Sequence, residues 1–175
     1  MKIAVQTGGP EERYGIKDAY RVIAEAGFDA VDANVDHLFR WDDIMQKKIP
    51  ACFLGGEKTC LEAFRPWKEG AEAAGIENYQ AHAPFPTYIY SPDDPAYNDA
   101  LINVLEKTIM GCDYIGCHKL VVHPFFLAYD TQLSREEEWA NNIDRYSRLI
   151  PAAKKYGAHT VTDMAQTAGL VPLDV

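Results

Sequence analysis

The chain has 175 residues, which is long enough for one domain with a sizeable core. Its hydrophobic fraction of 47% and charged fraction of 25% are ordinary for a soluble globular protein, and no apolar run approaches the roughly 20 residues that span a bilayer. The formal net charge of −9, with no tract rich in Lys or Arg, argues against nucleic-acid binding, because contacts to phosphates require clustered cations.

The amino terminus and the cysteines both favour a cytoplasmic protein. The first residues hold one Lys and then a strand-like run, which is too short for a secretory signal. The four cysteines, Cys52, Cys60, Cys112 and Cys117, include no C-x-x-C pair. We therefore expect free thiols in a reducing compartment, placed in the core or on helices, and no zinc site built from cysteines.

The first half of the chain predicts strands that alternate with helices. Residues 2–7 form a short β-rich run that ends at a Gly-Gly-Pro turn. Residues 16–26 carry apolar side chains at helical spacing and end at Gly27, before a second strand over 28–33. The irregular segment 34–59 is interpreted as a long loop with one helical turn. Loops of this length inside a compact domain are usually functional.

The alternation continues through the middle of the chain. A helix interrupted at Pro66 is expected to end at Gly75, before a strand that ends in His82. The next helix carries an apolar stripe and is expected to end at Gly116, before a strand that begins at His118 and ends in His123.

The last helix is expected to begin at a capping box, with Ser134 as the cap and Glu137 three residues later. It ends at Gly157, and residues 159–163 form a fifth strand. Its buried side is expected to comprise Trp139, Ile143, Tyr146, Ile150 and Ala153.

This alternation indicates parallel βα units with right-handed crossovers, so the fold class is α/β. Two architectures fit the pattern, an open doubly wound sheet and a (β/α) barrel. The first strand is followed by GGPEER rather than by the G-x-G-x-x-G of dinucleotide-binding folds. In both architectures a ligand binds at the carboxyl edge of the sheet.

Two predicted strands carry a histidine near their carboxyl ends, shortly before a proline: His82 in NYQAHAPF and His123 in HKLVVHPFF. Parallel strands bring these ends to one edge, so the imidazoles could converge on a single site, and neutral imidazoles suit Mn, Co or Zn. The alternative is that each is a hydrogen-bonded residue at a strand end. His118 and His159 begin their strands and are expected at the opposite edge, and His37 is expected at the surface.

Other strand-end side chains could complete a pocket. Gln6 and Asp32 end the first two strands and could hydrogen-bond a polyol, or could simply contact solvent. Phe85 and Phe125 follow the histidines and could stack on a sugar, or could pack under a loop. Asp163 is the obvious carboxylate to join the two histidines, because a usable metal site needs at least three ligands.

Five short stretches carry a resemblance to a known superfamily. QTGG after the first strand, AGFDAVD into the second, QAHAPF at the third, KLVVHPF at the fourth and AKKYG before the fifth resemble the xylose-isomerase-like TIM barrels. That superfamily includes sugar phosphate isomerases and epimerases and the endonuclease IV type of DNA-repair enzyme. The resemblance implies a partial (β/α) barrel domain over 1–164, with an irregular tail over 165–175. It also implies a divalent metal (Mn, Mg, Co or Zn), a sugar or sugar phosphate as substrate, and proton transfer next to a carbonyl.

The chain departs from the superfamily in length and at its fifth strand. A closed barrel has eight strands and typically roughly 250 residues, whereas this chain is expected to reach only five strands. The superfamily's fifth strand usually ends in a metal-binding Glu followed by Asn, and the direct register places Thr162 and Asp163 there. We take His82, His123 and Asp163 as candidate metal ligands, with Asp163 also the candidate catalytic residue, and expect weak metal binding.

Three functions remain open on the sequence alone. The first is a metal-dependent sugar isomerase or epimerase, impaired if the chain is truncated after the fifth strand. The second is a non-catalytic partial barrel or fragment that self-associates through its unpaired strand edges. The third is a DNA-repair nuclease of the same fold, against which the acidic charge counts.

Overall fold

The computed structural model describes residues 2–84, 94–124 and 134–161. Five strands form one sheet in which neighbouring strands are parallel and the spatial order follows the chain. They are β1 (Ala4–Gln6), β2 (Ala30–Ala33), β3 (Glu77–His82), β4 (Lys119–Val121) and β5 (His159–Val161). This order is that of consecutive units of a (β/α) barrel, whereas a doubly wound sheet reverses its strand order. The predicted partial barrel is therefore confirmed.

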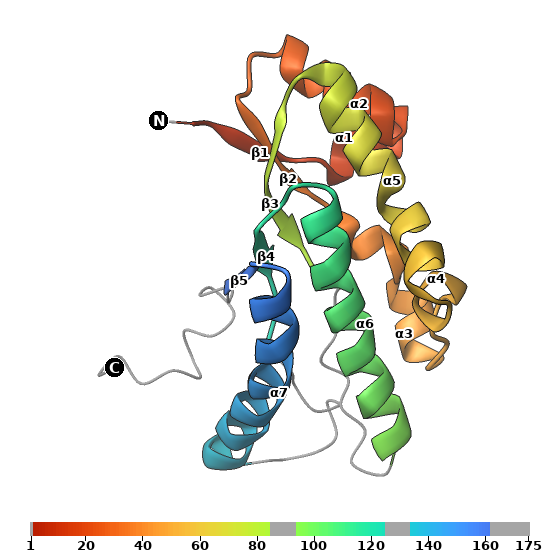
Figure 1. Cartoon of the computed structure of the whole chain (residues 1–175), viewed down its shortest axis with the longest axis vertical. Helices are drawn as coiled ribbons and strands as arrows, with labels where there is room; N and C mark the ends of the chain where they lie inside the picture. Colours follow the sequence, from red (N-terminus) through yellow and green to blue (C-terminus); the bar gives the residue numbers. More distant parts are fainter. Residues whose placement is uncertain (1, 85–93, 125–133, 162–175) are drawn as a thin grey trace.

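Helices connect the strands and lie together on one side of the sheet (Figure 1). α1 (Gly8–Tyr14) and α2 (Ile16–Glu25) follow β1. After β2 come η1 (Val35–Leu38), α3 (Trp41–Met45), α4 (Ala51–Leu54) and α5 (Glu57–Ala74). α6 (Pro95–Tyr114) precedes β4, and α7 (Arg135–Lys155) precedes β5.

A glycine stands shortly before each of the strands β2 to β5, as the sequence predicts. Gly27, Gly75, Gly116 and Gly157 adopt φ values of 87°, 65°, 75° and 62°. Residues with a Cβ rarely adopt this left-handed conformation, so glycine ends each helix and turns the chain into the next strand without strain.

The core lies between the sheet and a layer in which α2, α5, α6 and α7 pack in chain order. Its large buried side chains include Tyr20 on α2, Phe64 and Trp67 on α5, and Leu105 on α6. α5 and α6 approach closely because Gly111 has no side chain: a Cβ there would lie 2.5 Å from the Phe64 ring. Close packing of this kind makes the contact between the two helices sensitive to a single added methyl group.

Three segments differ from the sequence prediction. α5 runs without interruption through Pro66. Phe64 and Trp67, on either side of the proline, are both buried, and their packing offsets the hydrogen bond that proline removes. The segment 34–59 contains η1, α3 and α4 rather than a single helical turn, and α1 begins where a turn was expected.

The predicted buried side of α7 is largely wrong. Trp139, Ile143 and Ile150 are 40%, 50% and 47% exposed, whereas Asn142, Arg145 and Leu149 are buried. Tyr146 does reach inward, and its hydroxyl donates to the Val122 carbonyl at 3.0 Å. Within the described part of the chain, α7 packs mainly against α6 on one flank, so the apolar side chains on its other flank face solvent. The capping box of Ser134 and Glu137 is present as predicted.

Two further sequence predictions concern the thiols and the membrane. All four cysteines are free, and Cys60, Cys112 and Cys117 are buried, as expected. Within the described ranges, no helix combines the length and apolar character that a membrane crossing requires.

Candidate functional site

His82 and His123 lie side by side at the carboxyl edge of the sheet. His82 ends β3, and His123 follows the neighbouring parallel strand β4. The centres of their imidazole rings are 5.7 Å apart, with 35° between the ring planes. The prediction that these two histidines share one rim is confirmed. His118 precedes β4 and His159 begins β5, so both lie at the opposite edge, also as predicted.

Asp32, near the end of β2, contacts both His82 and Gln80. Its Oδ1 atom lies 2.9 Å from His82 Nδ1, and its Oδ2 atom accepts a hydrogen bond from Gln80 Nε2 at 2.9 Å. The carboxylate orients the imidazole and favours the tautomer with a proton on Nδ1, which leaves Nε2 as the basic nitrogen.

An irregularity in strand pairing creates this arrangement. Val31 pairs with Asn78, but the next residue, Asp32, pairs with Gln80, so that Tyr79 is skipped. Side chains alternate between the two faces of a strand, and without the irregularity Tyr79 would lie opposite Asp32. No motif in the sequence signals the irregularity, so the contact of Gln80 with Asp32 cannot be predicted from the sequence.

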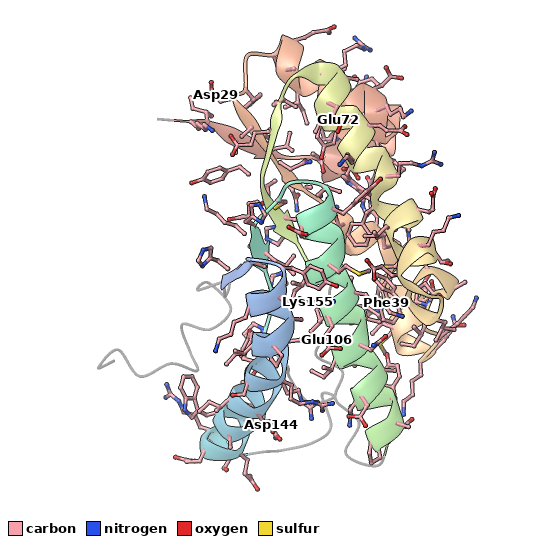
Figure 2. The ribbon with its side chains drawn as sticks, viewed as in Figure 1. Asp29, Phe39, Glu72, Glu106, Asp144 and Lys155 are labelled. Carbon is pink, nitrogen blue, oxygen red and sulfur yellow. The ribbon has the colours of Figure 1, made fainter. Side chains whose placement is uncertain are left out.

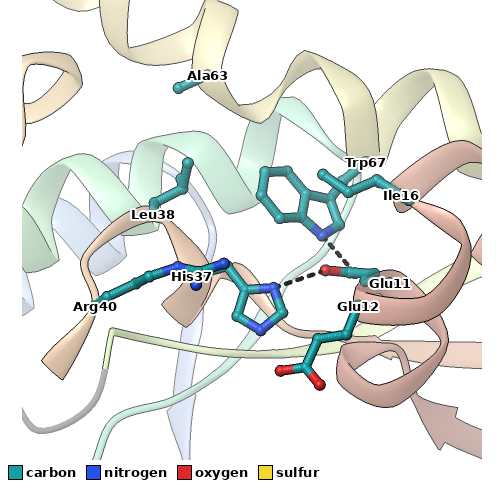
Figure 3. Close-up of a pocket in the computed structure, with 9 residues that line it drawn as sticks. Glu11, Glu12, Ile16, His37, Leu38, Arg40, Ala63 and Trp67 are labelled. Carbon is teal, nitrogen blue, oxygen red and sulfur yellow. Dashed lines mark hydrogen bonds and ion pairs between the residues drawn. The ribbon is translucent and has the colours of Figure 1, made fainter.

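A second group of polar side chains runs from Gln6 into the helix layer. Gln6 Nε2 donates to Asn34 Oδ1 at 3.2 Å, and Asn34 Nδ2 lies 3.0 Å from His37 Nε2. His37 Nδ1 lies 3.2 Å from Glu11 Oε2, and the Trp67 indole N–H donates to Glu11 Oε1 at 2.9 Å (Figure 3). His37, expected at the surface, is thus one member of a network whose residues come from separate segments.

Glu11 is the buried acid of this network. Its side chain is 2% exposed, and burial raises the pKa of its carboxyl group, while hydrogen bonds from Thr7 and Trp67 and the charge of His37 oppose that rise. Gly8 leaves room for the network, because a Cβ there would lie 2.7 Å from Asn34 Nδ2. This close approach accounts for the glycine that follows β1.

The described residues meet part of the requirement for a divalent metal. Two imidazoles bound to one ion at about 2.0–2.1 Å have ring centres roughly 5–6 Å apart. The 5.7 Å between His82 and His123 fits this geometry. Among the described residues, however, no group of three or more His, Cys, Asp and Glu side chains is placed to hold an ion. Asp163, Phe85 and Phe125, the remaining predicted site residues, lie outside the described ranges.

Comparison with known proteins identifies the class of fold. No protein-family model and no curated protein sequence matches the chain. Its structural neighbours among solved proteins include two sugar epimerases and the IOLI protein. Because the sequence identities are low, this likeness shows the fold alone.

Three of these neighbours illustrate the match. The D-allulose 3-epimerase from Methylomonas sp. shares 18% identity over 93% of this chain and 51% of its own, with a TM-score of 0.62. The 3-keto-D-glucoside 4-epimerase from E. coli shares 16% identity over 93% of this chain and 55% of its own, with a TM-score of 0.63. The IOLI protein, solved with a zinc atom, shares 14% identity over 93% of this chain and 51% of its own, with a TM-score of 0.61. This chain thus spans about half the length of the three neighbours.

Proposed function

We propose that this chain carries part of the active site of a metal-dependent sugar isomerase or epimerase. The observation that carries the proposal is the pairing of His82 with His123 on adjacent strand ends, with Asp32 bound to His82 Nδ1. A carboxylate behind a ligating histidine fixes the ring and raises its basicity, which is common in metal sites. The neighbours support the proposal, since two are sugar epimerases and a third was solved with zinc.

The proposed roles follow from the chemistry of each side chain. His82, His123 and Asp163 would hold the divalent ion, and imidazole ligands favour Mn, Co or Zn over Mg. When bound, the ion would polarise the carbonyl oxygen of the substrate. Asp163 would move the proton on the carbon next to that carbonyl. Gln6 and Asp32 would hydrogen-bond substrate hydroxyls, with Asp32 also orienting His82.

The proposed substrate is a sugar or sugar phosphate. Phe85 and Phe125 would stack on the C–H faces of the sugar. In the direct register Asp163 comes one residue late, which would turn its side chain to the other face of the strand, and Asp is one methylene shorter than the Glu of the superfamily. We therefore expect dissociation constants above roughly micromolar, or about −8 kcal/mol, and little isomerase activity from this chain alone.

Calorimetric titration of the protein with Mn and Co salts tests the shared site. His82→Ala and His123→Ala are each expected to abolish the heat of binding. Asp32→Asn is expected to weaken binding about tenfold, as losses behind a ligand do. His118→Ala, at the opposite edge, is the matched control and should bind as the parent does. Binding that survives His82→Ala unchanged would rule the shared site out.

The role of Asp163 has its own test, because its register is open. Thr162→Glu should strengthen metal binding if the direct register holds. Asp163→Ala should weaken binding only if the strand is slipped by one residue, since such a slip turns the side chain to the other face. The same titration distinguishes the two registers.

A second candidate, a partial barrel that self-associates, is favoured by a separate observation. Three large apolar side chains of α7, Trp139, Ile143 and Ile150, face solvent, and within the described sheet β1 and β5 are edge strands. Exposed apolar surface and unpaired strand edges both promote association.

A further inference from the structure

A pocket of about 330 Å³ lies in the helix layer, apart from the histidine rim (Figure 3). It is bounded by α1, the start of α2, η1 and α5, and neither His82 nor His123 lines it. The indole of Trp67, together with Ile16 and Leu38, supplies its apolar wall. The pocket is therefore separate from the proposed metal site at His82 and His123.

The charges at the edge of the pocket are unpaired. Arg40 and Glu12 both line it and both are exposed. Among the described residues, neither side chain has a hydrogen bond or an ion pair, although the charge of Arg40 acts on the carboxyl group of Asp36 and opposes the rise in pKa that burial causes there. The two enter the pocket from different elements, Arg40 from the residues after η1 and Glu12 from α1 (Figure 3). Opposite charges that share one pocket without pairing leave both groups available to a ligand.

Glu11 presents a second carboxylate deeper in the pocket. Its Oε1 atom accepts from the Trp67 indole. Its Oε2 atom lies 3.2 Å from His37 Nδ1 and has no aligned hydrogen-bond donor, while the Thr7 hydroxyl hydrogen-bonds to the same carboxylate. A buried carboxylate oxygen without an aligned donor is costly, and a ligand ammonium group would supply a charge-assisted one.

We propose that this pocket binds a small zwitterion of the α-amino acid type. Its ammonium group would lie at Glu11 and Glu12, its carboxylate at Arg40, and its apolar side chain against Trp67. Pockets for drug-sized ligands range over roughly 300–1,000 Å³. The volume of about 330 Å³ is at the small end of this range and suits a molecule the size of one amino acid.

The test compares L-leucine with two analogues that each lack one charge. 4-Methylpentanoate lacks the amino group, and 3-methylbutylamine lacks the carboxylate. Trp67 provides the signal: the exposed Trp41 and Trp139 are replaced by Phe, which leaves one of the three tryptophans, the one in the pocket. L-leucine should give a saturable fluorescence change, and each analogue should bind at least about tenfold more weakly, because it loses a charge-assisted contact.

Substitutions of the edge charges locate the binding site. Arg40→Gln and Glu12→Gln should each weaken L-leucine binding about tenfold. Both side chains are exposed and unpaired, so the circular dichroism spectrum and the urea midpoint should match those of the parent. Lys58→Gln and Glu136→Gln remove exposed charges outside the pocket and serve as matched controls with unchanged binding.

Several results would overturn the proposal. One is the lack of any saturable response to L-leucine in the folded protein. Another is equal binding by either single-charge analogue, which would make the pocket a plain anion or cation site. A third is unchanged affinity in Arg40→Gln. The assay contains no metal, so its outcome is independent of the metal titration.

Discussion

The α5–α6 pair and α7 differ in how other helices cover them. α5 lies between α2 and α6, and α6 lies between α5 and α7 (Figure 1). The apolar faces of both are buried, whereas α7 leaves Trp139, Ile143 and Ile150 exposed (Figure 2 draws the side chains on these helices). All three helices carry large apolar residues, so the difference lies in their neighbours. Burial in this layer depends on which faces another element reaches.

The largest expected effect on stability comes from comparing Phe64→Ala with Ile143→Ala. Phe64 on α5 is fully buried, so its truncation should lower the free energy of unfolding by about 3–5 kcal/mol. Ile143 on α7 is half exposed, and its truncation should change that free energy by less than about 0.5 kcal/mol. Urea denaturation followed by circular dichroism measures both. Comparable losses would mean that the outer flank of α7, which carries Trp139, Ile143 and Ile150, is covered in solution.

A smaller effect is expected from Gly111→Ala on α6. The new methyl group would meet the Phe64 ring at 2.5 Å, and relieving that clash should cost about 1–3 kcal/mol. The control is Gly9→Ala on α1, where a Cβ meets nothing within 4 Å, and it should be neutral or stabilising. If Gly111→Ala stabilised the protein, the α5–α6 contact would have to be looser than described.

Glu11, which Trp67 of α5 contacts, should make stability depend on pH. Burial raises the pKa of its carboxyl group above the ordinary 4.5. A folded-state pKa above the unfolded value means that this group lowers stability as pH rises from below 4.5 through the folded-state pKa. Glu11→Gln should remove that fall, so the variant should gain stability relative to the parent toward neutral pH.

Urea denaturation at a series of pH values measures this gain, with the exposed Glu12→Gln as the control. A pH dependence that is the same in Glu11→Gln and the parent would assign the effect to other groups.

Substitutions on the outer flank of α7 are expected to have the smallest effect on stability. Their effect should instead be seen in self-association. We expect dimers or larger species at micromolar concentrations, because exposed apolar side chains and strand edges associate. Ile143→Lys with Ile150→Lys should reduce the mass seen by light scattering with little change in the free energy of unfolding. Leu54→Lys, on the 70% exposed Leu54 of α4, is the control. A parent that is monomeric throughout would count against this candidate.

The candidate site was predictable where it depended on strand ends. His82 and His123 could be placed together because parallel strands bring their carboxyl ends to one edge. The contact of Asp32 with Gln80 could not be predicted, because it depends on the skipped Tyr79 in the β2–β3 pairing. The network from Gln6 to Trp67 also escaped prediction, since its members meet only when α1, η1 and α5 pack.

The sequence by itself determined that five strands alternate with the long helices α2, α5, α6 and α7, although not the short helices α1, η1, α3 and α4. Glycines with positive φ, apolar periodicity and the Ser134 capping box are local signals, and each acts within a few residues of chain. Only the tertiary structure decided that α5 continues through Pro66 and that α7 turns Ile143 outward. Both outcomes depend on packing against other elements, and burial is a property of two surfaces in contact rather than of one apolar pattern.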